Sequence, residues 1–262
     1  MYQLATAPRG IGQALDSIFQ LTRTSFLRML PYAILMSLLS ALPFVYLLYS
    51  GALDNPALAA QAIFSRGYWL TVLVMLPLNT LLYGASIVRI ESIAQGADVG
   101  IGSSFRATLP RVPALIGGMI GFMLAIGVGF AFLVIPGFYL LGALFLFVPA
   151  IVLDGKGPIE SLNHSHKLVK GNWWRLATIG GIAFIILYLV YLVAAVLVGF
   201  AMGFRGTDPA FVFMVDMVST LIGGLLMMPF FSALYVEMYR EVKMRKEGGD
   251  LATRIESVGT AR

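Results

Sequence analysis

Six long apolar runs, separated by shorter polar segments, dominate the chain. The runs cover residues 26–49, 68–88, 113–135, 138–153, 176–202 and 211–236. An α-helix rises ~1.5 Å per residue, so about 20 residues cross the ~30 Å hydrocarbon core of a bilayer. The fourth run is shorter, follows the turn dipeptide Pro136-Gly137, and would span only ~24 Å. It therefore predicts either a tilted crossing or a re-entrant hairpin with the third run.

The polar segments before the first, third and fifth runs each predict a surface helix. Ile11, Leu15 and Ile18 recur at a spacing of three and four, which places them on one helical face. Comparable segments begin at Ile101 and at Pro158. We therefore expect an all-α integral membrane protein with six transmembrane helices as three hairpins, each preceded by a cytoplasmic amphipathic or interfacial helix. The expected organisation is a single membrane domain over residues 1–247 and a flexible cytoplasmic tail after Gly248-Gly249, over residues 248–262.

An internal threefold repeat is a further hypothesis. The second run of each hairpin contains a proline, and in the first and third hairpins a hydroxyl residue follows three positions later and a tyrosine six positions later. The matched positions are Pro77, Thr80 and Tyr83; Pro149; and Pro229, Ser232 and Tyr235. The alternative is coincidence, because proline and hydroxyl residues are common in membrane helices.

Composition places the chain in lipid and excludes several chemistries. Hydrophobic residues make up 59% of the chain and charged residues only 12%, about half the proportion in soluble domains. The mean hydropathy is +0.87, and no polar block is long enough for a separate globular domain. The absence of cysteine excludes disulfides, thiolate catalysis and Cys-containing metal sites.

The positions of the basic residues predict the orientation. Of the eighteen Lys and Arg residues, only Arg66 and Arg205 fall in the loops opposite the termini, which leaves sixteen on the side of the termini. Lys and Arg accumulate on the cytoplasmic side of membrane proteins. We expect both termini and the central polar stretch to be cytoplasmic. The excess of basic residues is thereby explained without a nucleic-acid partner.

A few polar residues inside the runs are candidates for function. Asp216 would cost ~2.5–3.5 kcal/mol at a helix centre, so it predicts either a proton or cation ligand or a side chain that reaches headgroups or Arg205. Asn79 would line a cavity or join two helices by a hydrogen bond. The candidate intramembrane polar residues are Asp216, Asn79, Tyr83, Ser219 and Tyr191.

The central stretch from Asp154 to Arg175 combines acids, two histidines, lysines and two tryptophans. His164 and His166 lie two apart and would point in different directions on a helix, which disfavours a shared metal ion. No HExxH, nucleophile-elbow or phosphate-loop motif is present, so we expect no enzyme activity, cofactor or metal. The candidate surface for anionic lipid headgroups or docking is Lys167, Lys170, Trp173, Trp174 and Arg175.

The residues from Ile135 to Leu176, PGFYL followed by VPAIVLDGKGPIESLNHSHKLVKGNWWRL, resemble YciC-type bacterial inner-membrane proteins and the related membrane domain of glycerophosphodiester phosphodiesterases. The resemblance implies a six-span envelope protein of a bacterial inner membrane, associated with membrane homeostasis. We therefore expect a non-catalytic protein that binds lipids or a membrane protein partner, including a second copy. The alternative is a small transporter or lipid-moving permease with a cavity between proline-broken helices.

Overall fold

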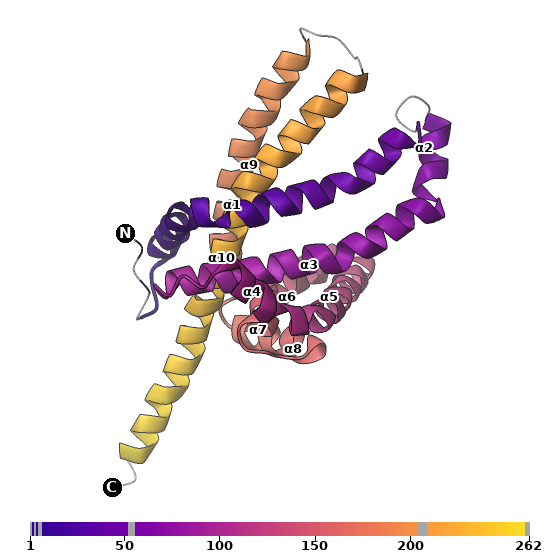
Figure 1. The fold of residues 1–262 in the computed structure, drawn as a ribbon. Coiled ribbons are helices and arrows are strands. Elements are labelled where there is room, and N and C mark those ends of the chain that lie inside the picture. The colour runs from indigo at the N-terminus through magenta and orange to yellow at the C-terminus, as the bar shows by residue number, and fades with distance from the viewer. Residues whose placement is uncertain (1, 3, 5–6, 52–55, 204–208, 260–262) are drawn as a thin grey trace.

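The computed structural model describes the backbone of residues 2, 4, 7–51, 56–203 and 209–259 (Figure 1), and side chains at most of these positions. Throughout this described part the secondary structure is helical. Six helical segments are long and apolar enough to cross a membrane. They are Ile11–Tyr49, Arg66–Ala94, Ile101–Phe132, Val134–Val152, Trp173–Val193 and Leu221–Lys246.

The helices follow one another with short connections. Their bounds are α1 (Ile11–Tyr49), α2 (Pro56–Ile63), α3 (Arg66–Ala94), α4 (Ile101–Thr108), the 3₁₀-helix η1 (Leu109–Arg111), α5 (Val112–Phe132), α6 (Val134–Leu144), α7 (Phe147–Val152), α8 (Pro158–Val169), α9 (Trp173–Gly203) and α10 (Pro209–Gly259). The fourth predicted span is thus divided into two helices, α6 and α7. The first predicted surface helix and the first span form one continuous helix, α1.

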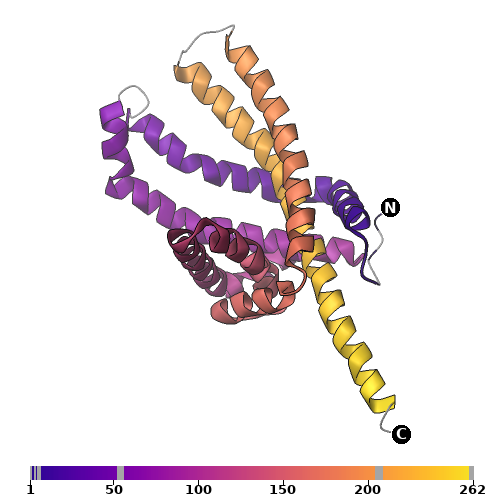
Figure 2. The same cartoon turned by 180° about the vertical axis from the view of Figure 1, so that it is seen from behind.

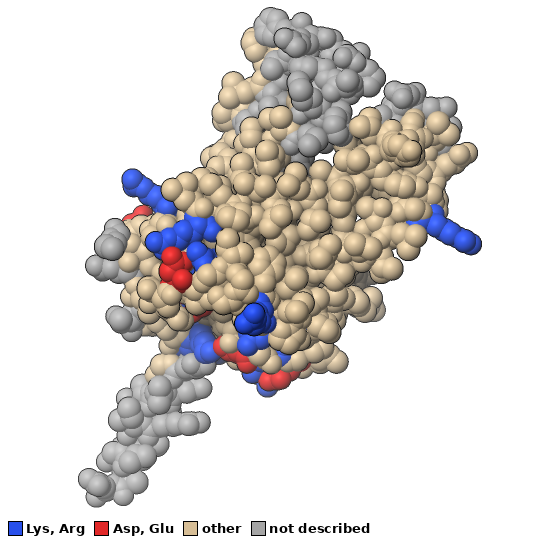
Figure 3. Space-filling model, in the orientation of Figure 1, with Lys and Arg blue, Asp and Glu red and all other residues tan. Residues whose placement is uncertain are grey.

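Three groups of helices build the molecule. Helices α1 and α3 run side by side, α9 and α10 project together away from them, and α5 to α8 form a compact group against α3 (Figures 1 and 2). Helix α10 packs against α1, α3 and α9 and therefore connects the pair α9 and α10 to the pair α1 and α3. On the face shown in Figure 3, charged side chains gather toward the left and lower margin, with one basic side chain at the right edge. Most of that face is uncharged, as expected of a surface in contact with lipid.

Small residues allow α1 and α10 to approach closely. A β-carbon added at Gly224 would clash with the Ser37 hydroxyl oxygen on α1, so a larger residue would require the Ser37 side chain to rotate or the helices to shift. Ala33 of α1 and Ala233 of α10 are both fully buried. Close backbone approach through small residues is a main source of helix association in membranes, where lipid is as apolar as the protein.

The turn between α5 and α6 lies at Leu133, three residues before the predicted Pro136-Gly137 turn. Leu133 has an extended backbone (φ −164°, ψ 149°), and Pro136 lies in the first turn of α6, where its missing N–H costs no helical hydrogen bond. Gly137 instead allows close packing, because an added β-carbon there would meet the Phe130 ring at 2.5 Å. The two glycines at 129 and 137 bring α5 and α6 together.

The end of α10 also differs from the prediction. The sequence placed the helix end at Gly248-Gly249, but α10 continues to Gly259. A glycine inside a helix costs only ~1 kcal/mol relative to alanine, so a glycine pair weakens a helix without ending it.

The break between α6 and α7 is held by α8. The Ser165 hydroxyl donates to the Ala143 carbonyl oxygen at 2.8 Å and accepts from the Leu146 amide at 3.1 Å. Ser165 and Leu146 are both fully buried. Ser165 therefore supplies the hydrogen bonds that the interrupted helix lacks, which a membrane interior requires.

Candidate functional site

An apolar cavity of about 480 Å³ lies between α1, α3, α5, α7 and α10. This volume is typical of small-molecule pockets, which span ~300–1,000 Å³. The described residues that line it are Met36, Pro43, Val72, Met75, Leu76, Asn79, Thr80, Tyr83, Leu115, Met119, Phe122, Met123, Phe147, Val148 and Tyr235. This lining set contains no Asp, Glu, Lys or Arg.

Asn79 lines this cavity, and its side-chain oxygen is unpaired in the described part of the chain. It lies near the middle of α3, and its Oδ1 atom is buried with no hydrogen-bond partner among the described residues. The neighbouring Thr80 hydroxyl is satisfied, because it donates to the Leu76 carbonyl oxygen at 2.7 Å. Leaving a buried polar group unpaired costs ~1–3 kcal/mol. The Asn79 Oδ1 atom is therefore an unpaired polar atom enclosed by the protein, with almost no surface open to the cavity.

Tyr83 and Tyr235 close one part of the cavity. Their rings meet edge to face, with centroids 5.9 Å apart and an interplanar angle of 87°. Phe145 stacks on Tyr235 at 4.1 Å, and the hydroxyls of Ser86 and Ser232 are hydrogen-bonded at 3.0 Å. Tyr83 and Tyr235, which occupy matched positions in the threefold-repeat hypothesis, therefore lie in contact with each other.

A second cavity of about 380 Å³ adjoins the first between α1, α3 and α10. The two cavities share Met36 and Tyr83 in their linings. Ser37 also lines the second cavity, and its hydroxyl oxygen is buried without a hydrogen-bond partner among the described residues. The two cavities thus lie one after the other along α1, and both are lined mainly by apolar side chains.

The other intramembrane candidates do not join this group. The Ser219 hydroxyl donates to the Val215 carbonyl oxygen of its own helix at 2.7 Å, and Tyr191 is 46% exposed on α9. The Asp216 side chain lies outside the described residues. Of the five predicted residues, the structure brings Asn79 and Tyr83 to one cavity.

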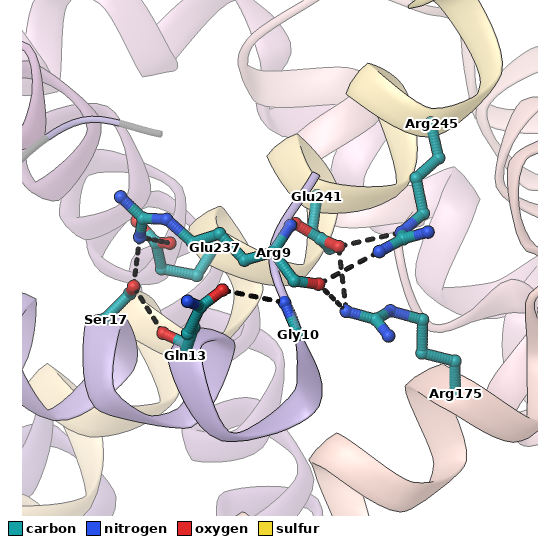
Figure 4. Close-up of polar contacts among 8 residues, drawn as sticks. All are labelled: Arg9, Gly10, Gln13, Ser17, Arg175, Glu237, Glu241 and Arg245. Carbon is teal, nitrogen blue, oxygen red and sulfur yellow. Dashed lines mark hydrogen bonds and ion pairs between the residues drawn. The ribbon is translucent and has the colours of Figure 1, made fainter. Parts of the chain in front are cut away.

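A buried charged cluster, consisting of Arg9, Arg175, Glu237, Glu241 and Arg245, joins the segment before α1 to α9 and α10 (Figure 4). Glu241 accepts from Arg175 at 3.0 Å and from Arg245 at 2.8 Å, and its side chain is only 7% exposed. Arg9 pairs with Glu237 at 3.7 Å, and its carbonyl oxygen accepts from Arg175 and Arg245. Arg175, predicted for lipid headgroups, is therefore engaged inside the protein.

A second polar group links α10 to the segment before α8. Asp154 accepts from the Tyr239 hydroxyl at 2.6 Å and from the Lys243 ammonium at 2.9 Å, and His164 lies 3.9 Å away. Burial acts to raise the pKa of Asp154, but the hydrogen bonds from Tyr239 and Lys243 and the nearby positive charges outweigh it and lower the pKa below its ordinary value. Asp154 is consequently a carboxylate that holds α10 in place.

The aromatic end of the central stretch packs against α6. Trp173 stacks on Tyr139 at 5.9 Å and donates from Nε1 to the Tyr139 carbonyl oxygen at 3.0 Å. His166 also contacts Tyr139, on another side of α8 from His164, and in the described part of the chain no group of three or more His, Asp or Glu could hold a metal ion. The exposed members of the predicted headgroup surface are Lys167, Lys170 and Trp174.

Comparison with protein families assigns the chain to a group. The model of the family described as "Domain of unknown function (DUF7847)" matches residues 33–242. The chain belongs to this family. Its matched region includes all the cavity-lining residues and most of the charged cluster, and excludes Arg9 and Arg245. Neither the curated proteins nor the solved structures gave a match to this DUF7847 member.

Sequence reasoning did not predict the roles of Ser165 and the two carboxylates of the charged cluster. Glu237 and Glu241 lie directly after the sixth apolar run, where charged residues are usually solvated. Their spacing of four residues places both on one helical face, which could have indicated a common set of basic partners. Ser165 carries no comparable signal, since a single serine between two histidines does not reveal a break in another helix.

Proposed function

We propose that this DUF7847 protein is a non-catalytic, multi-pass membrane protein that binds a membrane lipid and thereby supports lipid or envelope homeostasis. The observation that carries this proposal is the uncharged cavity between α1, α3, α5, α7 and α10. Its lining is almost wholly aliphatic, aromatic and methionine side chains, which suits an acyl or prenyl chain.

The position of Met123 supports entry from the bilayer. Met123 lines the cavity, lies in the middle of α5 and is 61% exposed. Its neighbours Ile120 and Leu124 are also exposed, at 54% and 65%. An exposed residue at the middle of a membrane-spanning helix faces lipid, so the cavity opens where lipid chains are available.

The proposed location is a bacterial inner membrane with both termini in the cytoplasm. The distribution of basic residues and the resemblance to YciC-type proteins over residues 135–176 support this location. In this orientation the exposed Lys167, Lys170 and Trp174 lie at the cytoplasmic interface, where they would contact anionic headgroups.

Lipid identification on the gently purified full chain tests the proposal. Native mass spectrometry should detect bound lipid on the wild type, and Met119→Trp, which fills the cavity, should remove it. Leu124→Trp is the control, because it places the same bulk on the exposed face of the same helix. A wild type without bound lipid, or Met119→Trp with an undiminished lipid signal, would refute cavity binding.

Lipid movement is the second candidate function, favoured by the two adjoining cavities that share Met36 and Tyr83. A permease would exchange a labelled lipid between the leaflets of reconstituted vesicles faster than protein-free vesicles do. A protein that only binds lipid would retain the label without accelerating exchange.

A further inference from the structure

A groove on α3 begins at a basic residue and ends at the wall of the apolar cavity. Its volume is about 530 Å³, and its described lining comes from α3 alone. Val72 and Leu76 line both the groove and the large cavity, so the two spaces adjoin. The described lining residues of the groove are Arg66, Trp69, Leu70, Val72, Leu73 and Leu76.

The groove has the length of one bilayer leaflet. Arg66 is the first residue of α3, and the ten-residue step to Leu76 corresponds to ~15 Å along the helix axis. The hydrocarbon core of a bilayer is ~30 Å thick, so ~15 Å is the depth of one leaflet. Trp69 suits the membrane interface, where tryptophan is enriched, and Leu76 then lies near the midplane. A lipid with its headgroup at Arg66 therefore extends its chains as far as the cavity.

The lining has a charged end and an apolar body. Arg66 is exposed, and in the described part of the chain no acidic side chain pairs with it. The uncharged side chains of Trp69, Leu70 and Leu73 are exposed too, at 56%, 60% and 67%. A guanidinium forms strong, often bidentate hydrogen bonds with phosphate oxygens. The groove is therefore complementary to a molecule with a phosphate at one end and a hydrocarbon chain at the other.

The charge of the groove favours an anionic headgroup over a zwitterionic one. Figure 1 shows the start of α3, beside α2, at the opposite end of the α1 and α3 pair from the N-terminus. Arg205, the other basic residue predicted on this side of the membrane, lies outside the described residues. A choline or ethanolamine headgroup would bring its ammonium near the guanidinium, and the described lining holds no carboxylate to pair with it.

We propose that the groove binds an anionic phospholipid, whose phosphate is held by Arg66 and whose chain follows α3 toward the cavity. This inference rests on the proposed lipid-binding function and names its ligand class and point of entry. In the proposed orientation the bound lipid belongs to the leaflet opposite the cytoplasm. Arg66 is thus the specificity-determining residue, and the shared wall at Val72 and Leu76 connects its site to the cavity.

The groove contains its own fluorescent reporter. The chain has three tryptophans, so replacing Trp173 and Trp174 by phenylalanine leaves Trp69 alone. Bromine atoms on a lipid chain quench tryptophan fluorescence only at short range, so quenching of Trp69 reports lipid in the groove. The full-length protein is reconstituted in phosphatidylcholine bilayers. Brominated phosphatidylglycerol is then compared with brominated phosphatidylcholine of the same chains.

Brominated phosphatidylglycerol should occupy the groove about fivefold more strongly than brominated phosphatidylcholine, which is the effect of one basic residue on an anionic lipid. Arg66→Gln should bring the two lipids within about twofold of each other. Arg106→Gln is the matched control, because it removes an exposed arginine from α4, on the side of the termini. This control should keep the fivefold preference.

Equal quenching of Trp69 by the two lipids would overturn selection by charge, while leaving lipid binding intact. A fivefold preference that persists in Arg66→Gln would overturn the assignment to Arg66. Native mass spectrometry with all three tryptophans in place repeats the comparison without depending on the tryptophan replacements, and there Arg66→Gln should retain less phosphatidylglycerol than Arg106→Gln. A wild type that carries no lipid at all would instead refute the proposed function.

Discussion

Replacing Ser165 by alanine is the sharpest test of how α8 supports the cavity wall. Ser165 bridges the break between α6 and α7 through the Ala143 carbonyl oxygen and the Leu146 amide. Phe147 and Val148, the first residues of α7, line the cavity. Removal of one buried hydroxyl oxygen should therefore weaken both the helix break and the site beside it.

The expected destabilisation is about 2–6 kcal/mol. Ser165→Ala removes two hydrogen bonds and leaves a buried donor and a buried acceptor without their partner, and each such group costs ~1–3 kcal/mol. The loss of volume is small, so little of the effect comes from a new cavity. Water cannot compensate easily, because Ser165 and Leu146 are both fully buried.

Ser161→Ala is the matched control for this prediction. Ser161 lies on α8, one turn before Ser165, and is also fully buried. Its hydroxyl donates to the Pro158 carbonyl oxygen within its own helix, at 2.7 Å. Removal of that bond leaves no donor of another helix unpaired, so the expected change is below ~1 kcal/mol.

Unfolding by increasing SDS in mixed micelles measures both variants. Trp173 is a suitable fluorescent reporter, because it stacks on Tyr139 of α6. Ser165→Ala should unfold at a lower SDS fraction than the wild type, and Ser161→Ala should unfold close to it. If the two variants unfold together, Ser165 does not hold the break between α6 and α7.

Two further predictions concern the polar and glycine contacts. Asp154 has a lowered pKa, so its stabilising effect is complete above its ordinary pKa of 3.8 and is lost as the pH falls through the lowered value. Thermal unfolding of the wild type and Asp154→Asn, measured as the pH is lowered through 3.8, should therefore show a shrinking difference in stability. A difference that grows on acidification would contradict this prediction. Gly137→Ala should lower the free energy of unfolding by ~1–3 kcal/mol, because the added carbon would lie 2.5 Å from the Phe130 ring. Gly127→Ala is the control: its added carbon meets nothing within 4 Å, so its stability in the same assay should equal that of the wild type.

The membrane-spanning segments were predictable because they follow from a local physical requirement. A chain in lipid must satisfy its backbone hydrogen bonds within each segment, so long apolar runs must be helices. Each of the six candidate spans found in the described residues overlaps one of the six predicted runs. Their ends were less predictable, because the turn at Leu133 and the continuation of α10 depend on contacts between helices. The residue types at positions 136–137 and 248–249 do not by themselves determine where these helices end.

The candidate site was predictable only in part, for the same reason. Asn79 was predicted because amides are rare in apolar helices. Tyr83 was predicted because its position in the second run matches that of Tyr235 in the sixth. Neither pattern could show that Asn79 lacks a partner or that Tyr83 packs against Tyr235. The charged cluster was missed because the basic residues were interpreted as signals of orientation, although Arg175 has specific partners inside the protein.

These partners change where lipid specificity should arise. Arg175 pairs with Glu241 and Lys156 with Glu160, which leaves Lys167 and Lys170 as the exposed basic residues of the central stretch. Each basic residue near an anionic leaflet contributes ~1 kcal/mol, so two of them favour anionic headgroups by only about 30-fold, without selecting among them. The surface of the central stretch can hold the protein against a membrane. Selection among anionic lipids must therefore come from a part of the protein other than these two lysines.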